Sequence, residues 1–168
     1  MNLSFKTMKS PVGKLTLVAS DQKLVAILWE EDDPKRVRLG ELSEDKKHPV
    51  LLDAEEQLKE YFEGKRKKFS LKLETTGTEF QKQVWDELLN IPFGEIRTYG
   101  EIAKKIKRPK AVRAVGAAIG RNPISIIIPC HRVIGSSGKL TGFAGGLENK
   151  ECLLDLEVPN GKTPPIRR

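Results

Sequence analysis

The chain has 168 residues and a formal net charge of +7, with 38% hydrophobic and 32% charged residues. This length suits one domain or two small ones, and the composition is that of a folded globular protein rather than a disordered one. No apolar run approaches the roughly 18 residues of a membrane span, and we expect no secretory leader because the first residues lack an apolar core. The two cysteines, Cys130 and Cys152, exclude a disulfide framework and a C-x-x-C motif. We therefore expect a reducing, cytoplasmic location.

The first part of the chain has the pattern of a small α/β domain. Within residues 1–30, short runs of β-branched or alternating apolar residues, with turn residues between them, predict a β-meander. Residues 31–49 are polar and are expected to form a loop. Residues 50–62 place apolar side chains at helical spacing, with Gly64 ending the helix, and residues 67–74 predict one more strand.

We place a domain boundary at Gly77. It separates an N-terminal domain, residues 1–76, from a second domain, residues 77–157. The remaining residues, 158–168, are rich in proline and basic side chains and are predicted to be a disordered tail.

Two capping boxes predict where helices of the second domain begin. In each, a threonine hydroxyl and a side chain three residues later satisfy each other's backbone N–H groups. The first box pairs Thr78 with Gln81, and the second pairs Thr98 with Glu101. These positions predict one helix after residue 78 and another after residue 98.

A third helix is predicted over residues 110–120, with Pro109 in its first turn, where the missing N–H of a proline costs nothing. Alanine and glycine make this helix slim, and Arg113 is its only long side chain after Lys110. Together with the preceding helix it forms a candidate helix-turn-helix. A slim helix can pack closely against a neighbour, or it can enter a narrow DNA groove with Arg113 projecting.

The positive charge is concentrated around these helices. Ten Lys and Arg residues and one acidic residue, Glu101, lie between Arg97 and Lys139. Such a concentration predicts a polyanionic partner, most often nucleic acid. A solvated basic face is the alternative on charge alone.

The chemical centre is predicted at Cys130. A β-branched run, residues 124–128, predicts a buried strand that ends at Pro129, and His131 follows the cysteine. A cysteine at this place, within the basic segment, is a candidate thiolate nucleophile; a small buried hydrophobic residue is the alternative. Because neighbouring side chains of a strand point to opposite faces, His131 reaches Cys130 only if the proline bends the chain or a water bridges them.

The segment Ile-Pro-Cys-His-Arg-Val, from Ile128 to Val133, resembles the signature of the O6-alkylguanine-DNA alkyltransferases, also called methylated-DNA–protein-cysteine methyltransferases. Further blocks resemble the family in its order, and they cover residues 78–157: FGEIRTYGEIA, RPKAVRAVGAAIGRNP, IIIPCHRVI and GFAGGLENKECLL. The resemblance implies an α/β (α+β) protein. Its N-terminal domain would be ribonuclease-H-like, and its C-terminal domain would be of the winged-helix, helix-turn-helix type.

The resemblance also implies the roles of five catalytic residues. Cys130 would accept the alkyl group, and His131 would take its proton through a water. Glu157 falls where the family places the carboxylate that orients this histidine. Asn122 falls at the family's asparagine hinge, and Tyr99 matches the tyrosine that helps rotate the target nucleotide and hydrogen-bonds the guanine.

Five residues of the slim helix match the family's DNA-binding surface. Arg113 matches the arginine that enters the base stack and fills the space of the flipped base. Ala111, Val112, Ala114 and Gly116 would line the surface facing the minor groove.

Four residues are expected around the alkyl pocket: Phe143, Ala144, Ser125 and Val133. The family often has tyrosine and serine where this chain has Phe143 and Ala144, so a hydroxyl that could touch O6 is missing, although the backbone N–H of Ala144 remains. Ser125 stands where some relatives carry proline. Both departures concern the size of the alkyl group rather than the core reaction.

The function implied by the resemblance is direct, single-turnover DNA repair, in which the alkyl group of O6-alkylguanine moves to the protein. The expected partner is double-stranded DNA carrying the lesion, approached from the minor groove with base flipping; O4-alkylthymine stays open as a second substrate. We expect a monomer with no cofactor, no metal and no membrane contact.

Two other functions stay open at this point. A non-catalytic lesion-binding relative would have replaced the cysteine, which is present here. A plain helix-turn-helix regulator would need no cysteine and would usually dimerise on paired half-sites.

Overall fold

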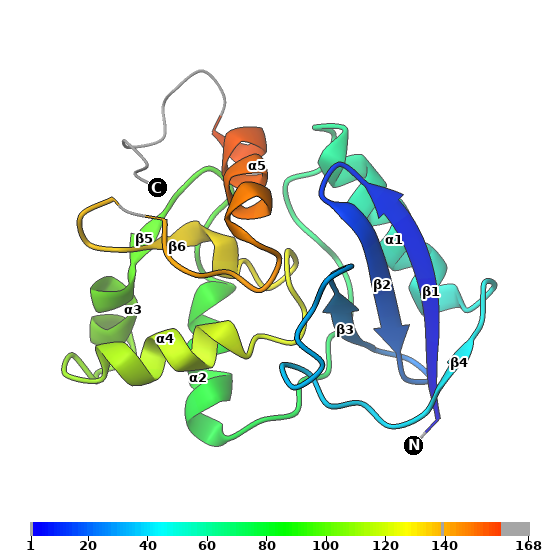
Figure 1. The fold of residues 1–168 in the computed structure, drawn as a ribbon, viewed down its shortest axis with the longest axis horizontal. Coiled ribbons are helices and arrows are strands. Elements are labelled where there is room, and N and C mark those ends of the chain that lie inside the picture. Colours follow the sequence, from blue (N-terminus) through cyan, green and yellow to red (C-terminus); the bar gives the residue numbers. More distant parts are fainter. Residues whose placement is uncertain (1, 139, 159–168) are drawn as a thin grey trace. The chain divides into compact units, whose positions relative to one another are not determined.

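The structure of the protein, a computed structural model, describes residues 2–138 and 140–158. The chain divides into two compact units, one formed by the residues up to Thr75 with Pro123–Ser125, the other by Thr76–Asn122 and the residues from Ile126 onward. The elements follow one another along the chain as labelled in Figure 1: β1 (Leu3–Ser10), β2 (Gly13–Ala19), β3 (Leu24–Leu28), β4 (Leu42–Glu44), α1 (Pro49–Phe62), α2 (Glu79–Leu88), β5 (Arg97–Thr98), α3 (Tyr99–Lys105), α4 (Val112–Gly120), the 3-10 turn η1 (Cys130–Arg132), β6 (Val133–Ile134) and α5 (Leu147–Glu157).

The first unit is a four-stranded sheet with one helix on its face. The strand order is β3-β2-β1-β4, with β1 antiparallel to β2 and β2 antiparallel to β3, so the predicted meander is confirmed. Helix α1 packs across the sheet (Figure 1) and buries Leu51, Ala54, Leu58 and Tyr61. It ends as predicted, because Glu63 closes the last turn and Gly64 takes a φ of +77° that favours glycine.

Two predictions for this unit are wrong. The predicted loop over residues 31–49 contains β4, a three-residue strand that pairs parallel to the start of β1. The predicted strand over residues 67–74 does not form; its one bridge joins Leu73 to Leu24. The side-chain amide of Gln57 instead binds both backbone groups of Ser70, accepting from its N–H at 2.9 Å and donating to its C=O at 3.2 Å. The Gln57 amide thus satisfies backbone groups of Ser70 that a neighbouring strand would otherwise have bonded.

The second unit is built around helices α2, α3 and α4, which contact one another in pairs. Both predicted capping boxes are confirmed, with Thr78 and Thr98 as the N-caps of α2 and α3. The indole N–H of Trp85 in α2 donates to the carbonyl oxygen of Ala118 in α4 at 2.8 Å. This bond fixes the helix that the sequence singled out as slim.

Helix α4 begins at Val112, so the prediction that Pro109 lies in its first turn is wrong. The N–H of Ala111 donates to the carbonyl oxygen of Arg108 at 2.9 Å, which closes a turn with Pro109 at its second position. A proline is well suited to that position because its fixed φ matches the turn.

The β-branched run over residues 124–128 is buried, as predicted, but it is not a strand. Ile124 makes a single bridge to Ile27, and the chain then turns at Ile126, which has a φ of +76°. A left-handed conformation is unusual for a β-branched residue. The turn persists because buried neighbours hold it on both sides.

The rest of the second unit consists of the two-stranded parallel sheet β5-β6, the turn η1, the loop after β6 and helix α5. None of the helices in residues 2–138 and 140–158 is long and apolar enough to cross a membrane. The prediction of a disordered tail falls almost wholly on residues 159–168, which lie outside the described residues.

We predict that Gly77→Ala destabilises the second unit by about 1–3 kcal/mol, the usual range for overpacking. A Cβ at Gly77 would lie 2.7 Å from the ring of Trp85, which is buried and hydrogen-bonded and therefore has little freedom to move. The free energy of unfolding, measured by urea denaturation, tests this. Gly120→Ala is the matched control, because a Cβ there meets no atom within 4 Å. Equal stability of the two variants would contradict the packing argument.

Candidate active site

The 3-10 turn η1 carries Cys130 and follows directly on Pro129. The N–H of Arg132 donates to the carbonyl oxygen of Pro129, and the N–H of Val133 donates to that of Cys130. The cysteine is 4% exposed. Cys130 and His131 therefore lie on a helical turn that begins directly after Pro129, which is the bent geometry that the sequence left open.

A buried carboxylate, that of Glu157 at the end of α5, joins two residues of this turn. Its Oε2 lies 2.7 Å from Nε2 of His131. Its two oxygens also accept from Arg132, Oε1 from Nε at 2.7 Å and Oε2 from Nη2 at 3.1 Å. The remaining Arg132 nitrogen, Nη1, donates to the carbonyl oxygen of Ile91 at 2.6 Å. The carboxylate thus has a bidentate arginine on one side and the imidazole on the other.

The charges of this group follow from its burial. Burial acts to raise the pKa of Glu157, but the charges and hydrogen bonds of His131 and Arg132 outweigh it and lower the pKa to about 2. Burial also lowers the pKa of His131, and the attraction of Glu157 offsets this only in part. Because Arg132 already neutralises the carboxylate, a neutral His131 leaves no net charge buried.

A neutral His131 has a definite tautomer. Its Nε2 carries the proton, which is donated to Glu157, so Nδ1 presents a lone pair. Within the part of the chain that the structure describes, this Nδ1 is a buried nitrogen that no protein group hydrogen-bonds. The imidazole is therefore an oriented base that can accept one proton at Nδ1.

The predicted hinge residue, Asn122, is buried and donates from Nδ2 to the carbonyl oxygen of Ile128 at 2.8 Å. It spans the turn at Ile126 and fixes the chain two residues before Cys130. Ser125 belongs to the first unit, where its buried hydroxyl accepts from the indole N–H of Trp29 at 3.1 Å. This bond already occupies a side chain that the sequence assigned to the alkyl pocket.

Tyr99, the first residue of α3, is held at both ends of its side chain. Its ring lies against α4 beside Gly116, and its hydroxyl hydrogen-bonds the hydroxyl of Thr141. Burial raises the pKa of Tyr99; the bond from Thr141 acts to lower it, and the nearby Cys130 acts to raise it. The phenol therefore stays protonated, and so uncharged, at neutral pH, and it lies close enough to Cys130 for a thiolate there to oppose its ionisation.

A buried lysine, Lys150 in α5, faces the same cysteine. It is 1% exposed, and its ammonium group donates to the carbonyl oxygen of Val133 at 2.7 Å. The ammonium also lies 6.0 Å from the centre of the Phe143 ring. Burial lowers the pKa of Lys150 to about 8, while the charge of Cys130 acts to raise it. The ammonium and a Cys130 thiolate therefore stabilise each other.

Two of the remaining residues expected at the pocket, Val133 and Phe143, lie near this lysine. Val133 is fully buried in β6, and its carbonyl oxygen accepts the hydrogen bond from Lys150. Phe143 and Ala144 are half-buried in the loop before α5. The Phe143 ring packs near the lysine and supplies no hydroxyl, as noted from the sequence.

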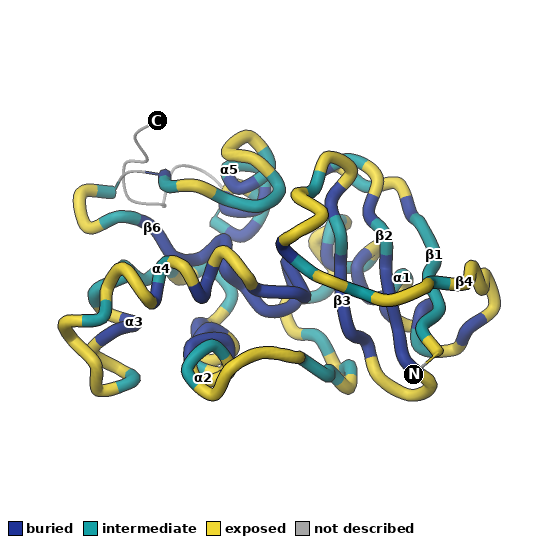
Figure 2. Tube along the Cα trace, turned by 60° about the horizontal axis from the view of Figure 1, so that its bottom comes forward, coloured by how far each residue is buried: buried dark blue, intermediate teal, exposed yellow. Residues whose placement is uncertain are grey.

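Four of the predicted DNA-binding residues lie in α4, and the fifth, Ala111, is the residue directly before it. Val112, Arg113 and Ala114 are exposed, whereas Ala111 and Gly116 are half-buried, and the opposite side packs in the core; exposed and buried residues alternate along α4 in Figure 2. Among the described residues, Arg113 is the one long side chain on the exposed side of this helix. Its slim, one-sided exposure makes α4 a candidate nucleic-acid interface.

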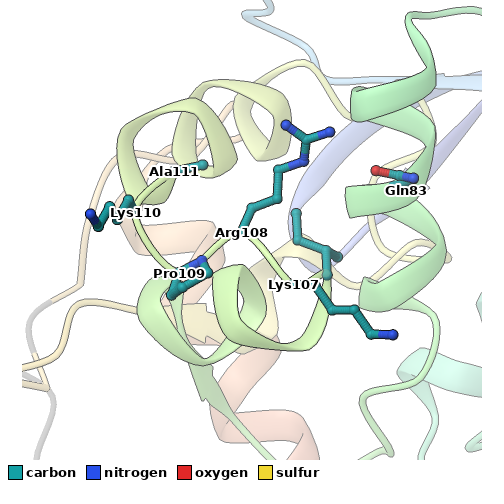
Figure 3. Close-up of a pocket in the computed structure, with 7 residues that line it drawn as sticks. Gln83, Lys107, Arg108, Pro109, Lys110 and Ala111 are labelled. Carbon is teal, nitrogen blue, oxygen red and sulfur yellow. The ribbon is translucent and has the colours of Figure 1, made fainter.

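A basic hollow of about 690 Å³ lies at the turn that precedes α4. It is lined by Gln83 of α2 and by turn residues that include Lys107, Arg108 and Lys110. In Figure 3 the Arg108 side chain extends toward α2, while Lys110 points to the opposite side. Arg108 also lies 5.9 Å from the centre of the Phe80 ring.

Three polar residues of the site were missed from the sequence as functional residues: Arg132, Thr141 and Lys150. Arg132 lies within the motif Ile128 to Val133, directly after His131. Because the resemblance assigned a carboxylate to His131, the same carboxylate could have been expected to bind Arg132 as well. Lys150 is the fourth residue of α5, close in sequence to Glu148 and Glu151, and nothing in its spacing distinguishes it from a surface lysine. Its role depends on burial, which only the fold supplies.

We predict that the free energy of unfolding falls as the pH is lowered from 7 to 5. The unfolded chain binds a proton at His131 below about pH 6.5, whereas burial depresses the folded-state pKa of this residue, so the unfolded state binds more protons. Glu157 adds a contribution of the same sign, which is present above about pH 4.3 and lost as the pH falls toward 2.

Urea denaturation at pH 7, 6 and 5 measures this dependence. In His131→Gln the loss of stability between pH 7 and 5 should shrink by up to about 2 kcal/mol, since the buried titrating group is gone. An unchanged pH dependence in the variant would show that His131 is not the group responsible.

We predict that Lys150→Met slows the reaction of Cys130 with iodoacetamide several-fold at pH 7, because the buried ammonium group no longer stabilises the thiolate. Lys105→Met, which removes the same charge from the exposed end of α3, is the control and should react at the rate of the unchanged protein. Equal rates for all three proteins would contradict the proposed electrostatic coupling.

Comparisons with known proteins cover both units. The family model described as "6-O-methylguanine DNA methyltransferase, DNA binding domain" matches residues 79–159, and the one described as "6-O-methylguanine DNA methyltransferase, ribonuclease-like domain" matches residues 3–75. The methylated-DNA–protein-cysteine methyltransferase of Methanosarcina mazei is 49% identical over 158 residues, covering 94% of this chain and 99% of the relative. The protein of the same name from Mycolicibacterium paratuberculosis is 46% identical over 155 residues, covering 92% of each chain.

A solved structure agrees with these relatives. The crystal structure of Mycobacterium tuberculosis OGT in complex with DNA matches with a TM-score of 0.84 and 46% identity, covering 92% of each chain. The predicted fold class, an α/β protein with a ribonuclease-like N-terminal domain and a helical DNA-binding C-terminal domain, is confirmed. This chain belongs to the 6-O-methylguanine DNA methyltransferase family.

Proposed function

We propose that this protein repairs DNA by moving the methyl group of O6-methylguanine onto the Cys130 sulfur. The observation that carries the proposal is the oriented base beside the cysteine: His131 is locked through Nε2 onto Glu157 and has an available Nδ1. Family membership supports the same reaction. A cysteine with an oriented base and a nearby buried ammonium group is suited to nucleophilic chemistry.

The transfer is a single displacement at carbon. Nδ1 of His131 takes the thiol proton, through a bridging water, while Glu157 and Arg132 hold the imidazole in place. The thiolate attacks the methyl carbon in line with its bond to O6, so an S–C bond forms as the C–O bond breaks. The electron pair of the broken bond stays on the guanine, whose ring edge accepts a hydrogen bond from the phenol of Tyr99.

The product explains why each molecule acts once. Removing the methyl group from the thioether product would require a second nucleophile to expel the Cys130 thiolate, a poor leaving group in such a displacement, and the proposed mechanism provides no such step. Repair is therefore stoichiometric, and no cofactor takes part because the damaged DNA itself supplies the methyl group.

The methylated oxygen lies within the base pair, so the nucleotide must leave the stack before it can react. Helix α4 presents its slim side to the minor groove, and Arg113 enters the space that the base leaves. Minor-groove contacts discriminate poorly between sequences, which suits a protein that must act on a lesion anywhere. The basic side chains at the turn before α4 contact phosphates, so affinity falls as salt rises.

The protein would work as a monomer in the cytoplasm. One chain carries the nucleophile, its base and the proposed DNA-reading helix, so no second copy is needed to complete the site. The reaction consumes a reduced thiol, which a reducing compartment preserves.

Mass spectrometry of the protein after mixing with a duplex that carries one O6-methylguanine tests the proposal. We expect one methyl group per protein, located on the Cys130 peptide, and none in Cys130→Ala, which should still bind the duplex. Cys152→Ala is the matched control and should accept the methyl group at an unchanged rate. Tight lesion binding without added mass would instead favour a non-catalytic lesion-binding protein.

We predict that Arg113→Ala slows methyl transfer from duplex DNA by more than tenfold but slows transfer from the free O6-methylguanine base by less than twofold. The side chain is needed only where an extruded base leaves a gap in the stack. Single-turnover rates on the two substrates measure this, and Lys23→Ala, which removes a positive charge from an exposed turn of the first unit, is the control. Equal losses on both substrates would exclude this role for Arg113.

A further inference from the structure

The phenol of Tyr99 has a hydrogen-bond partner that has no role in the methyl transfer proposed above. This partner is the hydroxyl of Thr141, which lies 42 residues further along the chain in the loop between β6 and α5. Either hydroxyl can be the donor in the pair. Because each hydroxyl has one proton and two lone pairs, the pair can form a directed chain that ends on a third group.

The packing around the Tyr99 ring does not by itself fix the direction of its O–H bond. Its ring lies against the helix at Gly116, with ring carbons 3.8 and 3.9 Å from the place where a Cβ would stand. The ring contact fixes the plane of the phenol but not the direction of its O–H bond. Thr141 contacts the oxygen itself and can set that direction.

The chemistry of the leaving group makes this direction matter. Burial raises the pKa of Tyr99, which makes a buried phenol a weaker donor, and the bond from Thr141 acts in the opposite sense. A hydrogen bond donated to a hydroxyl oxygen strengthens the bond that the same hydroxyl donates onward. The developing negative charge on the guanine would then receive a stronger hydrogen bond than an isolated tyrosine gives.

The part of the loop next to Phe143 and Ala144 contains one hydroxyl-bearing side chain. Residues 140–146 read Leu-Thr-Gly-Phe-Ala-Gly-Gly, so Thr141 is the one hydroxyl-bearing residue of this stretch. Phe143 and Ala144, the two loop residues expected at the alkyl pocket, have side chains that cannot donate a hydrogen bond.

We propose that Thr141 is a positioning residue for methyl transfer, whose hydroxyl donates to the Tyr99 oxygen and so directs the phenol proton toward the departing guanine. The inference rests on the proposed function. Thr141 keeps its proton throughout. The bond that forms is S–C, the bond that breaks is C–O6, and the electron pair released onto the guanine is stabilised through Tyr99.

Single-turnover methyl transfer at saturating duplex tests the proposal with two variants. Thr141→Val has nearly the same shape but no hydroxyl, and we expect it to react about tenfold more slowly, the effect of losing one hydrogen bond. Thr141→Ser restores the hydroxyl and should react within about threefold of the unchanged protein. A serine variant as slow as the valine variant would show that the methyl group, not the hydroxyl, is what matters, and would overturn the proposal.

The dependence on Tyr99 is tested by a double-mutant cycle. In the Tyr99→Phe background, Thr141→Val should cause no further slowing, because the group on which it acts is absent. The same tenfold loss in both backgrounds would overturn the proposal, since Thr141 would then act independently of Tyr99.

Two further measurements separate the possible failures. The rate of Cys130 alkylation by iodoacetamide should be equal in the unchanged protein and in Thr141→Val, because this reagent needs the thiolate but no guanine leaving group. A parallel fall of this rate would mean that the substitution disturbs the site as a whole, and would contradict the positioning role. If the unchanged protein itself fails to take up the methyl group, the proposed function fails; if it succeeds and Thr141→Val reacts equally fast, only the role of Thr141 fails.

Discussion

The buried carboxylate of Glu157 is the group on which the rest of the site depends. It carries one negative charge among two basic side chains, and the bidentate contact with Arg132 neutralises it. Because Arg132 already balances the negative charge of Glu157, His131 does not have to be protonated to do so. It can stay neutral although its Nε2 lies 2.7 Å from the carboxylate. Without Arg132 the same carboxylate would draw a proton onto His131 and remove its capacity as a base. Arg132 thus keeps His131 neutral, so that the imidazole acts as an oriented base and not as the cation of an ion pair with Glu157.

This arrangement explains why distant segments of the second unit must come together. Helix α5 supplies the carboxylate and Lys150, the turn η1 supplies Cys130 with its two neighbours, and the carbonyl oxygen of Ile91 after α2 holds the far side of Arg132. Asn122 fixes the turn that leads into Cys130. Each contact uses a backbone carbonyl or a charged group that would be costly to bury alone, so the site is assembled only in the complete fold.

The features that could be predicted from the sequence are those with local causes. The capping boxes at Thr78 and Thr98 need only residues three positions apart, and both formed as predicted. The strand expected over residues 124–128 failed because apolar composition specifies burial, whereas a strand also needs a backbone partner, and Ile126 turns away instead. Likewise the motif located Cys130 and His131, but the function of Lys150 and Thr141 depends on loop and helix positions that are far from them in sequence. Features that depend on residues close together in sequence can be predicted from it, whereas hydrogen bonds and charge pairs between distant residues need the fold.

The proposed chemistry depends most directly on a neutral His131, with its proton on Nε2 and an available Nδ1. Two-dimensional NMR of the protein with ¹⁵N-labelled histidine reads both nitrogens directly. We predict one protonated and one unprotonated ring nitrogen for His131 at pH 7, with the protonated one assigned to Nε2, and a pKa below that of a free histidine. An imidazolium signal at pH 7, or a proton on Nδ1, would contradict it.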